Sequence, residues 1–425
     1  MSIRESTLVR RARGLVMVGP AFAAAIAYVD PGNFATNFAA GADYGHRLLW
    51  VVVGANLMGM VVQFLSAKLG LATGANLAQL CRKRYPRPLV AGMWIQAELV
   101  AMATDLAEVI GGAVALSLLF DLPMAAGGLL VIAASFVILA LDARGKRKFE
   151  AVVAGCLGVI LLGFVWGLAA AGVRPGDLGS GLLPTVPDAQ ALLIAGGILG
   201  ATVMPHVVYL HSDLASRHSR EPRHPKDPAR RAAPDRRPDP DRQRALVWQI
   251  RLDVVAALAL AGLANVAMLV IAAQLFHGGP LPADTLESIH SGFGVLLGGG
   301  GALAFALALL ASGLASASVG TYAGQVVMAG FIGRTLPITV RRLITVLPVL
   351  VVLLLGVDAT QALLWSQLVL SFGIPFVLIP LVGFTRDTEL MGPLVNGRAT
   401  TVSAAVLAAV VVALNAVLAV TAVWS

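Results

Sequence analysis

The sequence predicts an all-α membrane protein with eleven transmembrane helices in a single domain, 1–425. Apolar residues make up 58% of the 425 residues and charged residues only 13%, whereas soluble globular proteins carry about 25% charge. Apolar runs long enough to cross a bilayer, about 20 residues each, recur along the whole chain. The 45 glycines are typical of closely packed membrane helices. This composition disfavours a disordered chain, a coiled coil, a secreted disulfide scaffold and an ordinary cytosolic enzyme.

The chain contains eleven candidate membrane spans. They lie at about 15–40, 48–72, 88–118, 123–141, 150–172, 189–214, 245–276, 293–330, 340–356, 361–384 and 400–424. The eighth run is long, and we expect it to include a cytoplasmic helical extension. The Gly298–Gly301 run inside it is not followed by Lys-Ser/Thr, so we expect it to bend or pack a helix rather than to bind phosphate.

Basic residues are confined to alternate connecting segments. Of the 31 Lys and Arg residues, 27 lie in the N-terminus and the even-numbered connections, and only Arg47 and Arg174 lie in the others. Positive charge remains on the cytoplasmic side of membrane proteins. The sequence therefore predicts a multi-pass protein of the inner (plasma) membrane with its N-terminus cytoplasmic and its C-terminus external. The net charge of +8 belongs to these loops, and we expect no nucleic-acid partner.

The segment 217–244 is a low-complexity stretch with several prolines among many Arg and Asp residues. Proline-rich charged sequences form extended linkers, and basic ones are attracted to anionic lipid. We expect a cytoplasmic loop here that contacts the membrane surface.

The first and sixth runs each carry a proline in mid-membrane, at Pro31 and Pro205. Proline lacks an N–H group and clashes with the carbonyl four residues earlier, so both helices are expected to break. The carbonyls released are those of Ala27 and Ala201. Unpaired carbonyls are costly in hydrocarbon and need a partner or a wet cavity.

Two breaks half a chain apart are typical of a transporter built from internal repeats with its site at the midplane. We expect repeat one at about 15–172 and repeat two at about 189–384, with 400–424 as an extra helix. Five helices in each repeat force the two repeats into opposite orientations. The predicted architecture is a 5+5 inverted repeat with helices 1 and 6 broken.

The residues at the breaks form a candidate metal site. The predicted ligands are a carboxylate, an amide, a thioether and two carbonyls, from Asp30, Asn33, Met204, Ala27 and Ala201. Oxygen ligands alone suit Mg²⁺ or Ca²⁺ as well as Mn²⁺, whereas a thioether favours softer transition metals. The set therefore favours Mn²⁺, Fe²⁺, Cd²⁺ or Co²⁺. The alternative roles are capping of the second half-helix by the Asp and Asn side chains and gap-filling by the Met side chain.

A second polar group lies on the third run, where Glu98, Asp105 and Glu108 occupy one side of a helix. His206 and His211 follow the break in the sixth run. Buried carboxylates and histidines are the usual components of a proton relay. The alternative is a buried salt-bridge network that holds helices together, with Arg251, Arg341 or Arg342 as partners. Glu98 and His211 fit this structural role better than direct proton transfer.

Amide side chains in other runs are further candidates. Gln367 and Gln63 could add amide oxygens to an occluded metal site, although simple hydrogen bonding between helices explains them equally well. Asn265 is interpreted as structural.

Two segments, Asp30-Pro31-Gly32-Asn33 and Met204-Pro205-His206, resemble the first- and sixth-helix signatures of the Nramp (natural resistance-associated macrophage protein) family of the bacterial MntH type. The resemblance continues through segments 63–70, 103–108, 320–325 and 371–375 and covers nearly the whole chain. The chain differs from the family pattern at Val207-Val208, and Asp213 stands where a neutral residue is expected.

The resemblance implies a LeuT-type fold and proton-coupled import of Mn²⁺ and Fe²⁺. It places the metal ligands on Asp30, Asn33, Met204 and the carbonyls of Ala27 and Ala201. It further implies that Asp30, His206, Asp105 and Glu108 handle protons. The metal is then cargo and H⁺ the coupling ion, with no prosthetic group.

Other functions remain open from the sequence. A sodium- or proton-coupled organic solute symporter of the same fold would use its broken helices to bind a carboxylate. An enzyme is not expected, because no nucleophile–base pair, phosphate loop or metal-hydrolase motif is present. The expected partners are divalent transition metal ions, protons and the lipid bilayer, and we expect the protein to function as a monomer.

Overall fold

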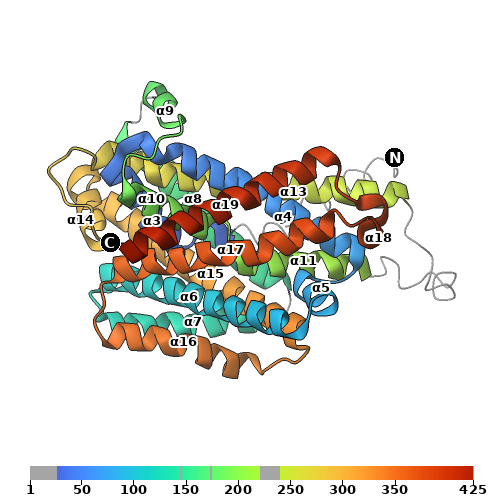
Figure 1. The fold of residues 1–425 in the computed structure, drawn as a ribbon. Coiled ribbons are helices and arrows are strands. Elements are labelled where there is room, and N and C mark those ends of the chain that lie inside the picture. Colours follow the sequence, from blue (N-terminus) through green and yellow to red (C-terminus); the bar gives the residue numbers. More distant parts are fainter. Residues whose placement is uncertain (1–25, 144–145, 173–174, 221–239, 425) are drawn as a thin grey trace, which may run out of the picture.

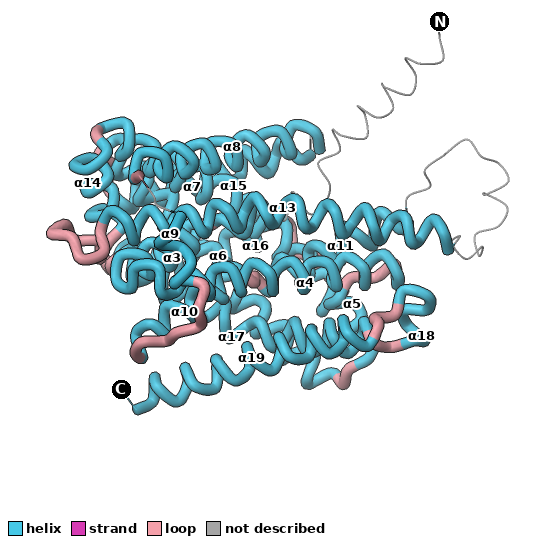
Figure 2. Tube along the Cα trace, turned by 90° about the horizontal axis from the view of Figure 1, so that it is seen from above, coloured by secondary structure: helices cyan, strands magenta, loops and turns pink. Residues whose placement is uncertain are grey.

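The computed structural model describes residues 26–143, 146–172, 175–220 and 240–424, and all regular elements in these ranges are helices. Figure 1 shows them as a bundle of long helices that run roughly side by side. Figure 2 shows the same bundle turned by 90°. The N-terminal arginines, the first part of the first predicted span and most of the 217–244 loop lie outside the described residues.

Each predicted span corresponds to helix in the structure. The spanning elements are η1 (Ile26–Val29) with α3 (Pro31–Tyr44), α4 (Leu49–Thr73), α6 (Arg87–Phe120), α7 (Met124–Ala143), α8 (Lys146–Ala171), α10 (Ala189–Thr202) with α11 (Pro205–Arg220), α13 (Pro240–Leu275), α15 (Gly299–Ile332), α16 (Ile338–Leu354), α17 (Ala359–Thr385) and α19 (Arg398–Trp424). Eight segments of the described chain are long and apolar enough to cross a membrane, with the continuous stretch Pro31–Thr73 taken as one. The all-α membrane fold is confirmed.

Short helices fill the connections between the spans. They are η2 (Gly45–Leu48), α5 (Leu77–Arg84), α9 (Pro175–Gly181), α14 (Leu286–Leu297), α18 (Thr388–Met391) and η3 (Gly392–Leu394). Both views place α5 and α18 at the same end of the bundle. We call this the basic end, because α5 carries Arg82, Lys83 and Arg84 in its last turn.

Both predicted helix breaks are present. In the first span, η1 ends at Val29 and α3 begins at Pro31, with Asp30 in extended conformation between them. In the sixth span, α10 ends at Thr202 and α11 begins at Pro205. Proline is favourable at the first position of a helix and cannot continue the preceding one, so each proline ends one half-helix and starts the next.

The eighth span differs from the prediction of one helix over 293–330. Residues 293–297 belong to α14, and α15 starts at Gly299. The reason is Gly298, whose φ of 77° ends one helix and precedes the next; only glycine adopts that conformation readily. The sequence predicts that the glycine run bends or packs a helix, whereas in the structure it separates two helices.

The spans that surround the breaks pack closely. Helix α6 contacts α15 and α17, α11 contacts α4, and α13 contacts α3. Glycines permit the close approach: a Cβ on Gly200 of α10 would lie 1.9 Å from the backbone oxygen of Gln367 on α17. This packing surrounds both breaks with buried side chains and excludes lipid from them.

The sixth span has a capped start outside the membrane segments. The Asp188 carboxylate accepts a hydrogen bond from the Ala191 N–H at 2.8 Å and one from the Tyr44 hydroxyl at 2.7 Å. The backbone N–H of Ala191 is the main reason why the pKa of Asp188 lies below its usual value. A charged N-cap fixes where α10 begins, and so fixes the depth at which its break occurs.

Candidate metal site

Asp30 sits at the gap in the first span and caps α3. Its Oδ1 accepts the backbone N–H of Asn33 at 2.8 Å. The residue is fully buried, and its Oδ2 has no hydrogen-bond partner among the described residues. The predicted capping role is therefore real, but it uses only one of the two oxygens. A buried carboxylate oxygen without a partner is costly and needs an explanation.

The Asn33 amide lies between the two broken helices. In one orientation its Nδ2 donates to Asn265 Oδ1 at 3.0 Å. Its oxygen then faces Asp30 Oδ1 at 2.6 Å and the carbonyl oxygen of Ala201 at 3.0 Å. Without a bound ion this orientation is unfavourable, because the amide oxygen faces only hydrogen-bond acceptors. In the other orientation the amide nitrogen donates to the same two oxygens.

Two side chains that the sequence did not identify as site residues donate hydrogen bonds to backbone carbonyls of the first break. Asn265 Nδ2 on α13 donates to the carbonyl of Tyr28 at 3.0 Å. Ser312 Oγ on α15 donates to the carbonyl of Val29 at 2.6 Å. These hydrogen bonds agree with the interpretation of Asn265 as structural, because they join α13 to the broken first span. No local signal reveals these partners, because they lie more than 200 residues away in the chain.

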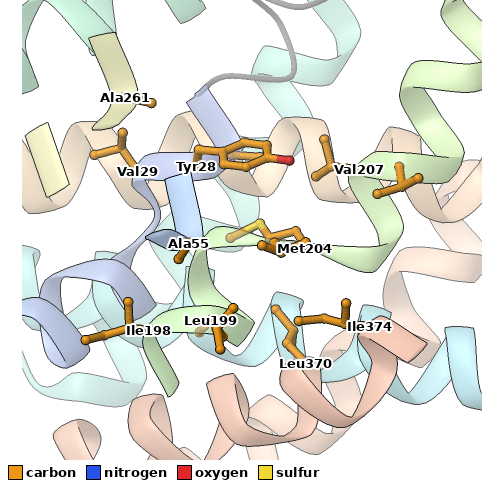
Figure 3. Close-up of a cluster of buried hydrophobic side chains, with 14 of the residues drawn as sticks. Tyr28, Val29, Ala55, Ile198, Leu199, Met204, Val207, Ala261, Leu370 and Ile374 are labelled. Carbon is orange, nitrogen blue, oxygen red and sulfur yellow. The ribbon is translucent and has the colours of Figure 1, made fainter. Parts of the chain in front are cut away.

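Met204 and Ala27 also lie at the breaks, and Met204 precedes Pro205 as Asp30 precedes Pro31. Met204 lies in the break between α10 and α11, with an exposed fraction of 1%, and Ala27 lies in η1 and is equally buried. Figure 3 shows the Met204 thioether at this bend, in a cluster that includes Tyr28 and Leu199. The Met204 side chain therefore takes part in apolar packing as well as lying beside the gap.

Gln367 on α17 reaches the first break. A Cβ on Gly32 would lie 2.0 Å from Gln367 Nε2, so the amide rests on the backbone next to Asp30. Gln367 Nε2 donates to Ser366 Oγ at 2.9 Å, while Oε1 has no partner in the described residues. The hydroxyl of Thr202, at the end of α10, is also buried without a partner. No local motif singles out Thr202 as a site residue.

The predicted proton residues lie directly behind this site. A Cβ on Gly111 of α6 would lie 2.1 Å from the Pro31 side chain. Glu108 lies one helical turn before Gly111 on the same face of α6. Glu108 is buried and its Oε2 has no partner in the described chain. His206 Nδ1 lies 3.3 Å from Thr104 Oγ1, and its Nε2 has no partner there either.

The other two acidic residues of α6 form ion pairs with α16. Arg342 Nη1 binds Asp105 Oδ1 and also donates to Thr321 Oγ1 at 2.7 Å. Arg341 Nη2 binds Glu98 Oε2 at 2.7 Å. The buried salt-bridge network considered from the sequence is therefore present. Arg251 is exposed and takes no part in the ion pairs of the described residues.

His211 and Gln63 form a separate polar chain. His211 Nδ1 lies 2.8 Å from Gln63 Oε1, and Gln63 Nε2 donates to the Tyr28 hydroxyl at 2.6 Å. This chain joins α11, α4 and η1 by interhelical hydrogen bonds. Gln63 thus takes the structural option of the two considered from the sequence.

Asp213, the unexpected acidic residue, lies in the middle of α11. It accepts from Asn76 Nδ2 at 2.9 Å and binds Arg217 Nε at 2.8 Å. Asn76 is also the N-cap of α5. Asp213 therefore fastens α11 to the connection between α4 and α6.

The arrangement around the breaks can hold a cation. Within the described residues, no three His, Cys, Asp or Glu side chains gather at one point. A cation there would use the mixed set that does converge, namely the Asp30 carboxylate, the Asn33 amide and the Ala201 carbonyl, with Gln367 and Thr202 nearby. The unpartnered oxygens supply negative potential without a fixed positive partner.

Residues 21–421 match the family described as natural resistance-associated macrophage protein-like. A curated divalent metal cation transporter MntH of Yersinia pestis is 45% identical over 406 residues, which cover 95% of this chain and 94% of that protein. A protein of the same description from Deinococcus radiodurans is 46% identical over 406 residues, 95% of this chain and 89% of its own.

Solved structures show the same fold. The manganese transporter of Eremococcus coleocola, in complex with an aromatic bis-isothiourea substituted compound, superposes with a TM-score of 0.81 at 31% identity. The match covers 94% of this chain and 85% of that one. Mhp1, a nucleobase-cation-symport-1 family transporter in a closed conformation, matches with a TM-score of 0.57 at 14% identity over 86% of this chain and 78% of that one. This second match concerns the fold alone.

Proposed function

Because this chain belongs to the natural resistance-associated macrophage protein family, we propose that it imports Mn²⁺ and Fe²⁺, together with Cd²⁺ and Co²⁺, by alternating access coupled to proton entry. The family consists of multi-pass membrane transporters, and the chain is a divalent metal cation transporter rather than an enzyme. The metal is its substrate. Proton coupling, the choice of metal and the individual ligands form our proposal.

One observation carries the proposal: the Asp30 carboxylate is fully buried at the breaks and forms no ion pair with a described residue. The Asn33 amide lies 2.6 Å from Asp30 Oδ1 and 3.0 Å from the Ala201 carbonyl, and Asp30 Oδ2 is unpartnered. A divalent ion would satisfy these atoms together. With the metal bound, Asn33 would turn its oxygen toward the ion and its Nδ2 toward Asn265.

The proposed ligands are Asp30, Asn33, Met204 and the carbonyls of Ala27 and Ala201, with Gln367 as a further oxygen donor. A thioether is a poor ligand for hard ions, so Met204 would discriminate against Mg²⁺ and Ca²⁺. A single carboxylate leaves the ion incompletely neutralised, which favours its release. The organic solute symporter considered from the sequence gives no role to this thioether.

Protons would move along the residues behind the metal site. A ring nitrogen of His206, Nε2, and a carboxylate oxygen of Glu108, Oε2, have no partner in the described chain. Each residue therefore has an atom free to accept a proton. Asp105 continues the path toward Arg342. We propose that the N-terminus is cytoplasmic, that the C-terminus is external and that a monomer is sufficient.

The test is metal uptake into proteoliposomes made with the full chain. Asp30→Ala should reduce Mn²⁺ uptake to background. Met204→Ala should retain Mn²⁺ uptake and admit Ca²⁺ or Mg²⁺, whereas Met93→Ala, which removes an equally buried thioether on α6, should leave selectivity unchanged. Unaltered exclusion of Ca²⁺ and Mg²⁺ in Met204→Ala would refute the thioether argument. Mn²⁺ uptake without acidification of the liposome lumen would refute the proposal that transport is coupled to protons.

A further inference from the structure

A groove of about 600 Å³ opens at the basic end of the bundle, and none of the proposed metal ligands lines it. It lies where α5 turns into α6, against the last turn of α15. Its walls include Arg82, Tyr85, Arg87, Trp94, Phe331 and Ile332. The transport function assigns nothing to this groove.

Positive charge at one end of the groove is not balanced by the protein. Arg82 and Arg87 are both exposed, and none of the lining residues is acidic. No ion pair in the described chain involves either arginine, whereas the neighbouring Arg84 lies 3.8 Å from Asp387. The groove therefore presents two guanidinium groups that are free to bind an anion. Guanidinium is well suited to phosphate, because its fork of N–H groups matches the phosphate oxygens.

Arg82 is held in place by the end of α15. A Cβ on Gly333 would lie 2.1 Å from Arg82 Nη1, so the guanidinium rests on the backbone where the helix ends. Gly333 has a φ of 75°, which only glycine adopts readily. A cation is favourable at a helix C-terminus, so the end of α15 favours this position of the Arg82 guanidinium.

The remainder of the groove is aromatic and apolar. Tyr85 stacks on Phe384 with ring centroids 5.6 Å apart, and Trp94 Nε1 donates to Glu98 at 3.1 Å. Glu98 itself is neutralised by Arg341. Tyr and Trp are enriched at the level where lipid headgroups meet acyl chains. Beyond them the apolar surface continues outward over exposed Ile95 and Ile332.

We propose that this groove binds one anionic phospholipid of the surrounding leaflet. Its phosphate would lie between Arg82 and Arg87, and an acyl chain would run along the apolar wall toward Ile332. Basic pockets between transmembrane helices at a membrane surface recognise anionic headgroups in this way. A free phosphate ion would use the two arginines but would leave the apolar wall unoccupied, and for this reason we commit to a lipid.

The experiment compares lipid binding by two variants of equal charge. Arg82→Gln/Arg87→Gln removes the arginines of the groove, and Lys83→Gln/Arg334→Gln removes two exposed basic residues outside it. Native mass spectrometry of the full chain should detect bound phosphatidylglycerol in the wild type and in the control. Retention should fall about tenfold or more in the groove variant. Equal retention in all three proteins, or an equal loss in the control, would overturn the proposal.

A further variant and a second probe separate the possible outcomes. Ala91→Phe fills the apolar part of the groove and keeps both arginines, so it should also lose the lipid even if the arginine variant folds poorly. Phosphatidylglycerol, but not phosphatidylcholine, should raise the melting temperature of the wild type in detergent. If inorganic phosphate produces the same rise, or if Ala91→Phe retains lipid fully, the groove is an anion site and the lipid proposal is wrong.

Discussion

The two buried polar regions of this protein differ in how their charges are balanced. At the helix breaks, Asp30 is fully buried and one of its carboxylate oxygens has no partner in the described residues. On α6, Asp105 is also buried and is bound by Arg342, whose guanidinium also reaches Thr321 and Ser135. An aspartate thus has a different role in each region. A carboxylate that lacks a fixed cation can accept a transported one, and a paired carboxylate joins helices.

The largest effect on stability is expected in the paired region. Asp105→Ala leaves the Arg342 guanidinium, with 1% of its side chain exposed, without its anion. An uncompensated buried charge costs about 3–5 kcal/mol, so the melting temperature in detergent should fall sharply. The double variant Asp105→Leu/Arg342→Met removes both charges and should recover most of the loss. If Asp105→Ala alone were as stable as the wild type, the pair would not be structural.

Asp30→Asn should show the opposite profile. The carboxylate has no cationic partner to lose, so stability should remain within about 1 kcal/mol of the wild type or rise. Mn²⁺ affinity by calorimetry should fall at least about 30-fold, since the ion loses its only charged ligand. A large drop in melting temperature with normal Mn²⁺ affinity would show that Asp30 stabilises the fold as Asp105 does and does not bind the metal.

Gly32→Ala tests the close approach of Gln367 to the first break. The added Cβ would lie 2.0 Å from Gln367 Nε2, and the amide would have to move. Overpacking of this kind costs about 1–3 kcal/mol, and we expect weaker Mn²⁺ binding as the amide leaves the site. Gln367→Ala removes the obstacle, so the double variant should be less destabilised than the two single changes predict. Strict additivity in thermal unfolding would rule out the contact.

The smallest effect is expected for an ion pair at the surface. Arg84 and Asp387 lie 3.8 Å apart with side chains 49% and 29% exposed. Such pairs contribute less than about 1 kcal/mol, so Arg84→Gln should hardly change the melting temperature. A loss as large as that of Asp105→Ala would mean that burial does not govern the value of ion pairs in this protein.

The sequence predicted those features whose cause is local. Each helix break follows from the covalent structure of a proline, and for this reason Pro31 and Pro205 could be assigned without any partner. The same argument selected the residues beside them. The long apolar runs predicted the spans, because each run alone decides whether a helix can cross the bilayer.

Features that depend on distant partners could not be predicted in this way. No local sequence pattern marks the polar residues that three other helices bring to the gap. They are Asn265 of α13, Ser312 of α15 and Thr202 of α10. The sequence offers three arginines as partners for the acidic residues of α6. Only the tertiary structure distinguishes Arg341 and Arg342 from Arg251. The glycine that separates α14 from α15 was recognised as a bend, but its positive φ could not be inferred from an apolar pattern.

The length of α6 and α15 has a consequence for how the protein meets its membrane. Each has 34 residues, which at 1.5 Å per residue is about 51 Å, against a hydrocarbon slab of about 30 Å. Two helices of this length that pack against each other must either tilt in the bilayer or extend beyond it. Bilayer thickness then influences the orientation of the protein. In a thinner membrane α6 and α15 would tilt further, and the helices packed against them would rotate with them.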